Sequence, residues 1–314
     1  MLARVANDLF WMGRYIERAE HTARYLNVNY FSSLDAPNKL SQSRTFVLNS
    51  MYALVDNRVE NTSELKENEV LYDIALNPEK TYSIIKCIKS ARENANSSRD
   101  LISTEFYESI NKFYHFVISY PKETFVKNGL FDFTTTVTEH TAILRAKIRG
   151  TILHDEVYAL IMLGMNIERA TQITRIIKTK FDDAERATGG YTNPFKNSYE
   201  WTTLLKCAES YDMMRRFYRK TPTQLITLEF LLLNPNCPRS VTNSLNQSYK
   251  HISQLDSLKL HNINSSSFLI GKMRSEYEFK TIEEVQKNVR EFIEDTLNKL
   301  IKISIKLEEE YFNY

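Results

Sequence analysis

The chain has 314 residues, of which 25% are charged, and its formal net charge is +2. A balance this close to neutral gives no basic footprint for nucleic acid and no charged surface for a membrane. Seven glycines and seven prolines fall far below the average usage of about 7% and 5%. So few turn residues predict long helices joined by short connections.

Three cysteines, Cys87, Cys207 and Cys237, are far apart and form no C-x-x-C pair. This excludes a disulfide framework and a structural zinc site, and it indicates a reducing compartment. The N-terminal segment carries charges throughout, unlike a secretory signal. The longest apolar runs are shorter than the roughly 20 residues that span a bilayer. We therefore expect a cytoplasmic protein without a membrane partner.

Helical periodicity extends over most of the sequence, beginning with the apolar stripe of Leu9, Met12 and Ile16. No segment has a convincing strand pattern, so the predicted fold class is an all-α multi-helix bundle. In chain order, the predicted helices are residues 3–29, 45–59, a helix that follows Asn61-Thr62-Ser63 and runs through Leu76, 79–94 with Pro78 before its first turn, 99–119, 136–179, 198–218, 222–233, one whose first turn carries Arg239 and Ser240, and 281–312.

No linker is long enough to demand separate domains, so residues 1–314 are predicted to form one domain. Within it, one pattern occurs twice, at Leu9–Arg24 and at Leu160–Arg175. The shared residues are Gly13, Ile16, Glu17, Arg18, Ala19 and Arg24 in the first copy and Gly164, Ile167, Glu168, Arg169, Ala170 and Arg175 in the second. The repeat predicts two related helices and a division into halves 1–128 and 129–314.

Each repeated helix carries a glycine one turn before its glutamate. Because glycine within a helix costs about 1 kcal/mol relative to alanine, Gly13 and Gly164 indicate that a second helix or a ligand approaches the backbone closely. If the two copies pack antiparallel about a pseudo-twofold axis, Glu17 faces Arg175 and Glu168 faces Arg24. One interpretation is therefore a buried brace of two reciprocal salt bridges, in which removing one partner costs about 3–5 kcal/mol.

The alternative interpretation is a polar cavity in which these acids and arginines bind a phosphate or carboxylate group. Further candidate arginines are Arg4 on the first helix, where Arg14 adds another positive group, Arg145 and Arg149 on one helix face, and Arg239, which follows Pro238 at a helix N-terminus. Such a surplus of arginine favours an anionic ligand. The same residues also fit solvated faces or i,i+4 pairs such as Glu20 with Arg24.

Known catalytic and metal-binding patterns are missing from the sequence. None of the six histidines has Asp or Glu three residues before it, as di-iron helical bundles require. His21 is replaced by Gln172 in the second copy. The chain also lacks H-E-x-x-H, G-x-G-x-x-G, G-x-x-x-x-G-K-[ST] and G-x-S-x-G. We expect neither a metal nor a cofactor.

Three blocks of the chain resemble the bacterial alpha-E domain family, also called DUF403. They are LARVANDLFWMGRYIERAEHTARYL, LRAKIRGTI with the following LGMNIERATQITRII, and LLLNPNCPRSV. The resemblance covers essentially the whole chain and implies an all-helical domain without an established activity. The family usually has Phe where this chain has Cys237, and commonly an aromatic pair where it has Tyr158-Ala159-Leu160, but the Glu-Arg cores and Arg239 are intact.

Genes of this family lie beside, or are fused to, those of a circularly permuted ATP-grasp protein and a transglutaminase-like cysteine peptidase homologue. The resemblance therefore implies these two proteins as partners in ATP-dependent peptide synthesis or modification. Three functions stay open: an accessory component that binds an anionic ligand or a partner, an enzyme of amide-bond chemistry with Glu17 or Glu168 as general base, and a purely structural scaffold.

Overall fold

The computed structural model describes residues 2–32, 44–55, 65–187, 198–255 and 262–312. Every regular element in these ranges is helical, which confirms the predicted all-α bundle. None of the described helices is long and apolar enough to cross a membrane. A single cluster of buried apolar side chains includes residues from both halves of the chain.

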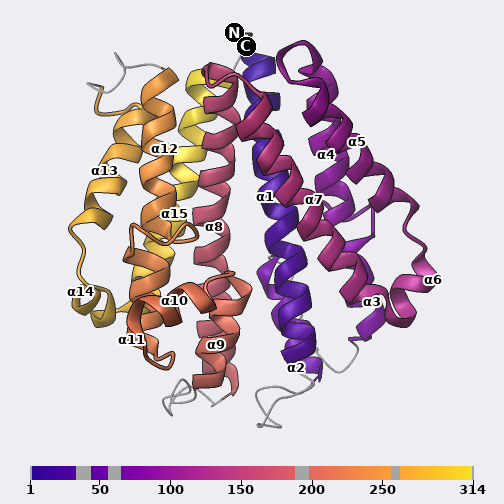
Figure 1. Cartoon of the computed structure of the whole chain (residues 1–314). Helices are drawn as coiled ribbons and strands as arrows, with labels where there is room; N and C mark the ends of the chain where they lie inside the picture. The colour runs from indigo at the N-terminus through magenta and orange to yellow at the C-terminus, as the bar shows by residue number, and fades with distance from the viewer. Residues whose placement is uncertain (1, 33–43, 56–64, 188–197, 256–261, 313–314) are drawn as a thin grey trace.

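Two long helices, α1 (Ala3–Ser32) and α8 (Glu156–Ala187), lie side by side in the middle of the bundle and carry the two repeat copies (Figure 1). They run parallel. Phe10, early in α1, lies against Gly164, early in α8. Asn29, near the end of α1, accepts a 2.6 Å hydrogen bond from Lys180, near the end of α8. The predicted antiparallel packing is therefore wrong, and the pseudo-twofold axis runs along the two helices.

Gly13 and Gly164 allow the two helix backbones to touch. A Cβ atom at Gly13 would lie 2.2 Å from the carbonyl oxygen of Ile161, and one at Gly164 would lie 2.1 Å from that of Phe10. Phe10 and Ile161 hold the same position in the two copies, so the contact is reciprocal. A second helix, rather than a ligand, explains both glycines.

Each central helix forms a bundle with the helices that follow it. In the first half α1 packs against α4 and α7, and α5 packs against α4 and α7. In the second half α8 packs against α12 and α15, and α13 packs against α12 and α15.

The remaining helices of the first half are α2 (Arg44–Leu54), α3 (Glu67–Ala75), α4 (Ile84–Ser97), α5 (Thr104–Ser119), α6 (Lys122–Thr124) and α7 (Leu130–Thr151). Those of the second are α9 (Ser198–Cys207), α10 (Tyr211–Tyr218), α11 (Gln224–Leu228), α12 (Val241–Leu255), α13 (Ser266–Glu278), α14 (Ile282–Lys287) and α15 (Val289–Leu307). Short turns of other helix types occupy Arg99–Leu101, Phe125–Gly129, Glu229–Leu233 and Glu308–Phe312.

The long helix predicted over 136–179 is interrupted at residues 152–155. Ile152 is extended (φ −101°, ψ 135°) and ends α7. The Asp155 side chain accepts a 2.9 Å hydrogen bond from the Val157 amide at the start of α8. Because α7 packs on α1 and α5, it is grouped here with the helices of the first half.

Serine caps explain two further differences from the predicted helices. Ser83 accepts a 3.2 Å hydrogen bond from the Lys86 amide and starts α4, so Pro78 does not begin that helix. Ser265 caps α13, a helix not predicted from the sequence, by accepting from the Phe268 amide at 3.1 Å. A capping side chain satisfies an amide that would otherwise lack a partner. The end of the predicted 45–59 helix and its neighbour Asn61-Thr62-Ser63 lie outside the described residues.

Candidate functional site

The two repeated glutamates are completely buried between α1 and α8. Arg18 donates to both oxygens of Glu168 at 2.7 and 3.0 Å, and Arg169 donates to both oxygens of Glu17 at 2.6 and 2.9 Å. The reciprocity is as predicted, but the partner is the arginine directly after each glutamate. The predicted pairs with Arg175 and Arg24 are wrong, because in a parallel pair side chains at the same height meet.

Glu168 lies at the centre of a compact group with Arg14, Arg18 and Gln172, here called the Glu168 cluster. Arg14 and Gln172 each donate to its carboxylate at 2.8 Å, and the Arg14 guanidinium lies 4.5 Å from the centre of the Trp11 ring. Burial alone would raise the pKa of Glu168, but Arg18 and Arg14 outweigh it and hold that pKa far below its ordinary value. No buried polar side-chain atom of these four residues lacks a hydrogen-bond partner, as in a structural brace.

Glu17 holds the equivalent position but has histidine where Glu168 has glutamine. Nε2 of His21 lies 3.2 Å from the Glu17 carboxylate. Burial would raise the pKa of Glu17, but Arg169 and His21 hold it well below its ordinary value. An ionised carboxylate only accepts, so Nε2 carries the proton, and Nδ1 has no partner among the described residues. Burial lowers the pKa of His21 to about 4 against the pull of Glu17, so the ring is neutral at pH 7.

A second acid, Glu20, lies one turn further along α1 and is also completely buried. Its carboxylate binds Arg24 of α1, Arg145 of α7 and Arg239, which precedes α12. Arg239 also reaches Glu17 at 3.3 Å. The group formed by Glu17, Glu20, His21, Arg24, Arg145, Arg169, Glu209 and Arg239 is here called the Glu17 cluster.

Positive charge exceeds negative charge in the Glu17 cluster. Four arginines meet three carboxylates there, since Glu209 binds Arg24 and Arg239. Burial, together with the charge of Arg239, lowers the pKa of Arg24 to about 10. Burial also lowers the pKa of Arg145 to about 10, although Glu17 opposes that shift. Nη1 of Arg24 has no partner among the described residues. The cluster therefore retains a guanidinium nitrogen that can donate a hydrogen bond to an anion.

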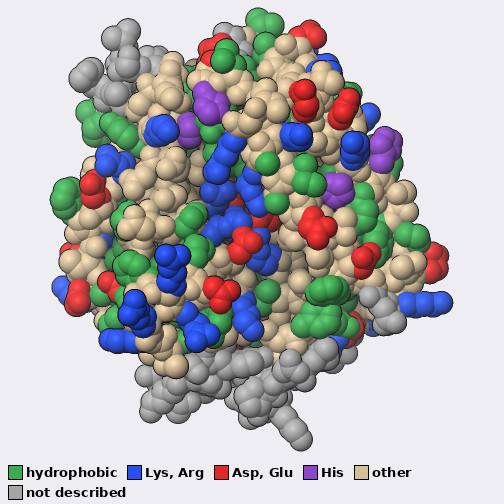
Figure 2. All heavy atoms as spheres, viewed as in Figure 1, with side chains coloured by type: hydrophobic (Ala, Val, Ile, Leu, Met, Phe, Trp, Pro, Cys, Tyr) green, Lys and Arg blue, Asp and Glu red, His purple; other side chains and the backbone are tan. Residues whose placement is uncertain are grey.

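The Glu17 cluster reaches the surface through Arg145 and Glu209. Their side chains are 20% and 54% exposed, whereas Glu17 and Glu20 are fully buried. Figure 2 shows a group of Lys and Arg side chains at the centre of the face where α1, α7 and α8 lie side by side. Arg145 and Glu209 are therefore the members of the cluster that an anion in solvent can reach first.

Glu209 adopts a backbone conformation that favours glycine. Its φ is 53°, and it ends α9 with two terminal hydrogen bonds, from its own amide to Lys206 at 3.0 Å and from Ser210 to Leu205 at 2.8 Å. Glycine is the usual residue at this point of a helix end. The carboxylate that glycine would lack is the one that bridges Arg24 and Arg239. Backbone strain of this kind is common at functional sites.

The other sequence candidates lie outside both clusters. Arg4 is exposed near the start of α1, and Arg149 is exposed one turn beyond Arg145 on α7. Arg175, the equivalent of Arg24, is partly exposed and lines a separate 570 Å³ pocket beside α15 together with Thr171, the equivalent of Glu20. Of the eight predicted residues, Glu17, Arg24, Arg145 and Arg239 come together in one cluster, and Glu168 lies in the other.

Sequence reasoning missed Arg18, Arg169 and Glu209 as members of the clusters, and it noted Arg14 only as a further positive group on the first helix. The repeat itself contained a usable signal for two of them, since Arg18 and Arg169 are identical in both copies. Glu20 was considered only as a helix-surface partner of Arg24. The sequence gives no comparable indication for Glu209. Its place in the cluster depends on a tertiary contact and on an unusual backbone conformation.

The cysteines are poor nucleophiles. All three are buried and free, and burial raises the pKa of both Cys87 and Cys207 to about 11. Burial also raises the pKa of Cys237. A thiol must ionise to act as a nucleophile. Within the described ranges, no group of three or more His, Cys, Asp or Glu side chains is placed to hold a metal ion.

Fold and site together define an all-α protein of two related halves, joined through paired Glu-Arg helices. The chain belongs to the Alpha-E family, described as a predicted alpha-helical domain with a conserved ER motif, whose family model matches residues 1–312. Neither the curated proteins nor the solved structures include a match to this chain. The Glu17-Arg18 and Glu168-Arg169 dipeptides give such a motif a physical role, because each supplies one half of a reciprocal pair.

Proposed function

We propose that this protein is a cytoplasmic accessory component of an ATP-grasp-linked peptide synthesis or modification system, and that its Glu17 cluster binds an anionic group. That group is a phosphate or carboxylate of a peptide, an acyl-phosphate intermediate or a partner protein. The proposed partners are the circularly permuted ATP-grasp protein and the transglutaminase-like protein. The surplus of arginine at a partly exposed cluster is the observation that carries the proposal.

The chemistry of the cluster supports binding better than catalysis. A general base needs a pKa near the working pH, whereas Glu17 and Glu168 are held ionised by arginine with pKa values far below neutral. Arginines that converge from four segments suit two-point recognition of phosphate or carboxylate oxygens. The Glu168 cluster, in which no buried polar side-chain atom lacks a partner, instead fits the structural role that was the alternative.

The Glu209 carboxylate acts in this proposal as a resident anion. It occupies the face of Arg24 and Arg239 that an incoming anion would use, and its half-exposed side chain can turn into solvent. Ligand and Glu209 therefore compete for the same two guanidinium groups. Removing the Glu209 charge should strengthen binding, which is the opposite of the usual effect of changing a residue in a binding site.

Calorimetric titration with inorganic phosphate tests this arrangement. We expect Glu209→Gln to bind phosphate at least about threefold more tightly than the wild type, and Arg145→Gln to bind it about tenfold more weakly, which is about 1.4 kcal/mol. Arg149→Gln is the matched control, because that arginine is exposed one turn away on the same helix, and it should bind like the wild type. Weaker binding by Glu209→Gln, equal effects of the two arginine variants, or no phosphate binding would exclude the site.

The accessory role is tested by adding the purified protein to its ATP-grasp partner and measuring ATP-dependent amide-bond formation. We expect the wild type and Arg149→Gln to raise the rate and Arg145→Gln to raise it less. Equal stimulation by all three proteins would show that the cluster is not needed by the partner. Turnover by the purified protein alone would instead favour the enzyme alternative.

A further inference from the structure

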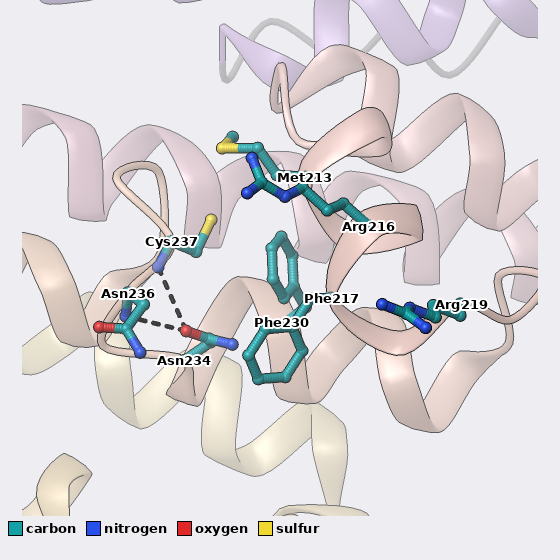
Figure 3. A pocket seen from close by; sticks show the side chains of 8 residues that line it. All are labelled: Met213, Arg216, Phe217, Arg219, Phe230, Asn234, Asn236 and Cys237. Atoms are coloured by element: carbon teal, nitrogen blue, oxygen red, sulfur yellow. Dashed lines mark hydrogen bonds between the residues drawn. The ribbon is translucent and has the colours of Figure 1, made fainter.

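A second candidate site lies on α10, where a pocket of about 510 Å³ opens between this helix and the chain segment that leads to α12 (Figure 3). Its lining residues are Met213, Arg216, Phe217, Arg219, Phe230, Asn234, Asn236 and Cys237. We propose that this pocket binds the C-terminal residue of a peptide that ends in an apolar side chain. The proposal concerns a different set of residues from the Glu17 cluster and does not depend on it.

Two phenylalanines form the apolar part of the pocket. The Phe217 and Phe230 rings lie 6.0 Å apart, centre to centre, at an angle of 45°. Phe230 is buried, whereas Phe217 is 58% exposed. Met213 lies beside them and adds a side chain that can adapt to different shapes. An apolar side chain that packs against Phe217 removes apolar surface from water, which favours binding by about 25 cal/mol per Å².

Positive charge in the pocket is not balanced by acid. Arg216 and Arg219 are both exposed, and no Asp or Glu is among the lining residues. Neither arginine forms a salt bridge with another described residue. In Figure 3 the Arg219 guanidinium points toward the two phenylalanine rings. Arg219 reaches this place from a left-handed backbone position, φ 53°, at the end of α10.

Asn234 adds a fixed hydrogen-bond donor. This side chain is only 7% exposed, and its Oδ1 accepts hydrogen bonds from the amides of Asn236 at 2.8 Å and Cys237 at 3.2 Å. Because the oxygen is held by these amides, the orientation of the side-chain amide is set. Nδ2 has no partner among the described residues and points toward the Phe230 side of the pocket (Figure 3).

The polar groups therefore supply donors beside an apolar wall. A terminal carboxylate presents only acceptors, and it lies one bond from the Cα atom that carries the last side chain. A nucleotide also combines a ring with negative charge, but its base carries donors as well as acceptors. Among the lining side chains, only Asn236 has an amide oxygen that accepts no hydrogen bond from another described residue. The donor set favours the peptide terminus.

Fluorescence anisotropy with an N-terminally labelled peptide, Gly-Ser-Gly-Gly-Phe, tests the proposal. We expect the free acid to bind at least about tenfold more tightly than the C-terminal amide, since the amide loses the charge that arginine recognises. Phe217→Ser and Arg216→Gln should each weaken binding of the free acid about fivefold or more. Both side chains are exposed, so the fold should tolerate these changes, which circular dichroism can verify.

Arg215→Gln is the matched control, because Arg215 is exposed on the same helix, lies against Tyr211 and does not line the pocket. It should bind the peptide like the wild type. Competition by N-acetylphenylalanine would show that the last residue alone suffices, whereas competition only by longer peptides would assign the site to a chain terminus.

Equal binding of acid and amide, absence of peptide binding, or displacement of the peptide by AMP with no preference for the acid would overturn the proposal. Equal effects of Arg215→Gln and Arg216→Gln would also do so. Because Arg145→Gln leaves this pocket unchanged, it should bind the peptide normally. Failure of phosphate binding at the Glu17 cluster is thereby distinguishable from failure here.

Discussion

The Glu168 and Glu17 clusters begin from the same positions of a repeated helix and end as different sites. In both, a buried carboxylate receives two hydrogen bonds from the arginine of the other copy. A side chain four residues later on the same helix, Gln172 or His21, adds one more contact. This shared part is the joint between the halves.

The two clusters differ in the residue that lies one turn further along each repeated helix. The first copy has Glu20 where the second has Thr171, and Glu20 gathers three arginines that would repel one another without it. Each cluster contains one more arginine than carboxylate, but only the Glu17 cluster has a buried guanidinium nitrogen, Nη1 of Arg24, without a partner among the described residues. The comparison teaches that the first copy differs from the second by further acids and arginines and by one unpartnered donor, and this difference is what the proposed binding function uses.

The largest expected effect separates the two glutamates. Glu168→Gln leaves Arg14 and Arg18 without a carboxylate, so we expect it to lower the free energy of unfolding by about 3–5 kcal/mol. Glu17→Gln should cost less, because Glu20 still pairs with Arg239. Urea unfolding at pH 7 measures both losses.

Arg14→Gln serves as a comparison within the Glu168 cluster, because it removes one donor and leaves the Arg18 pair in place. Its loss should be smaller than that of Glu168→Gln. If Glu17→Gln costs as much as Glu168→Gln or more, then Glu20 does not compensate, and the two clusters are more alike than their contacts indicate.

Much of this architecture could be predicted from local patterns. Low glycine and proline content and helical periodicity gave the fold class, and the repeat identified both central helices. Their relative direction could not be predicted in this way. A twofold axis along the helices and one across them both produce reciprocal contacts, so Gly13 and Gly164 fit either. The direction of the axis decides which residues of the two helices meet. In the parallel pair Glu17 meets Arg169 in place of Arg175.

The Glu17 cluster was only partly predictable for a related reason. Arg145 and Arg239 were suggested by helix position and by composition, but their convergence on Glu20 depends on how α7 and the segment before α12 pack against α1. Glu209 joins the cluster because α9 ends at that point with a positive φ. Such a contact between distant segments has no periodic signal in the sequence.

His21 gives the second comparison, because Gln172 holds its place in the other cluster. Its pKa falls from 6.5 to about 4 in the folded protein, so the unfolded chain binds more protons than the folded one over this range. The stability associated with neutral His21 is present above pH 6.5 and is lost as the pH falls toward 4, by about 3 kcal/mol in total.

His21→Gln should remove that part of the pH dependence. The glutamine can donate to Glu17 as Gln172 donates to Glu168, so we expect stability within about 1 kcal/mol of wild type at pH 7 and about 2 kcal/mol above it at pH 5. Urea unfolding of the variant and the wild type at both pH values measures the difference in stability. His140 and His251, whose pKa values burial also lowers, are present in both proteins, so their contributions cancel in this comparison. Parallel curves for the two proteins would contradict the assignment of a neutral, buried His21.

The smallest expected effect concerns the glycines that let the clusters form. Gly13→Ala places a Cβ 2.2 Å from a backbone oxygen that cannot rotate away, so α1 and α8 must separate. We expect a net loss of about 1–2 kcal/mol, since overpacking exceeds the helix-propensity gain of alanine. Gly150→Ala is the control: nothing lies within 4 Å of its Cβ position, and it should stabilise α7 by up to about 1 kcal/mol.

The double variant Gly13→Ala with Gly164→Ala then tests whether the two contacts act as one. Both glycines hold the same pair of helices together from opposite sides. Once the first alanine has separated α1 from α8, the second meets a gap that is already open, so the double variant should lose less than the sum of the single losses. Strictly additive losses in urea unfolding would mean that each clash is relieved locally, and the two clusters could then adjust independently of each other.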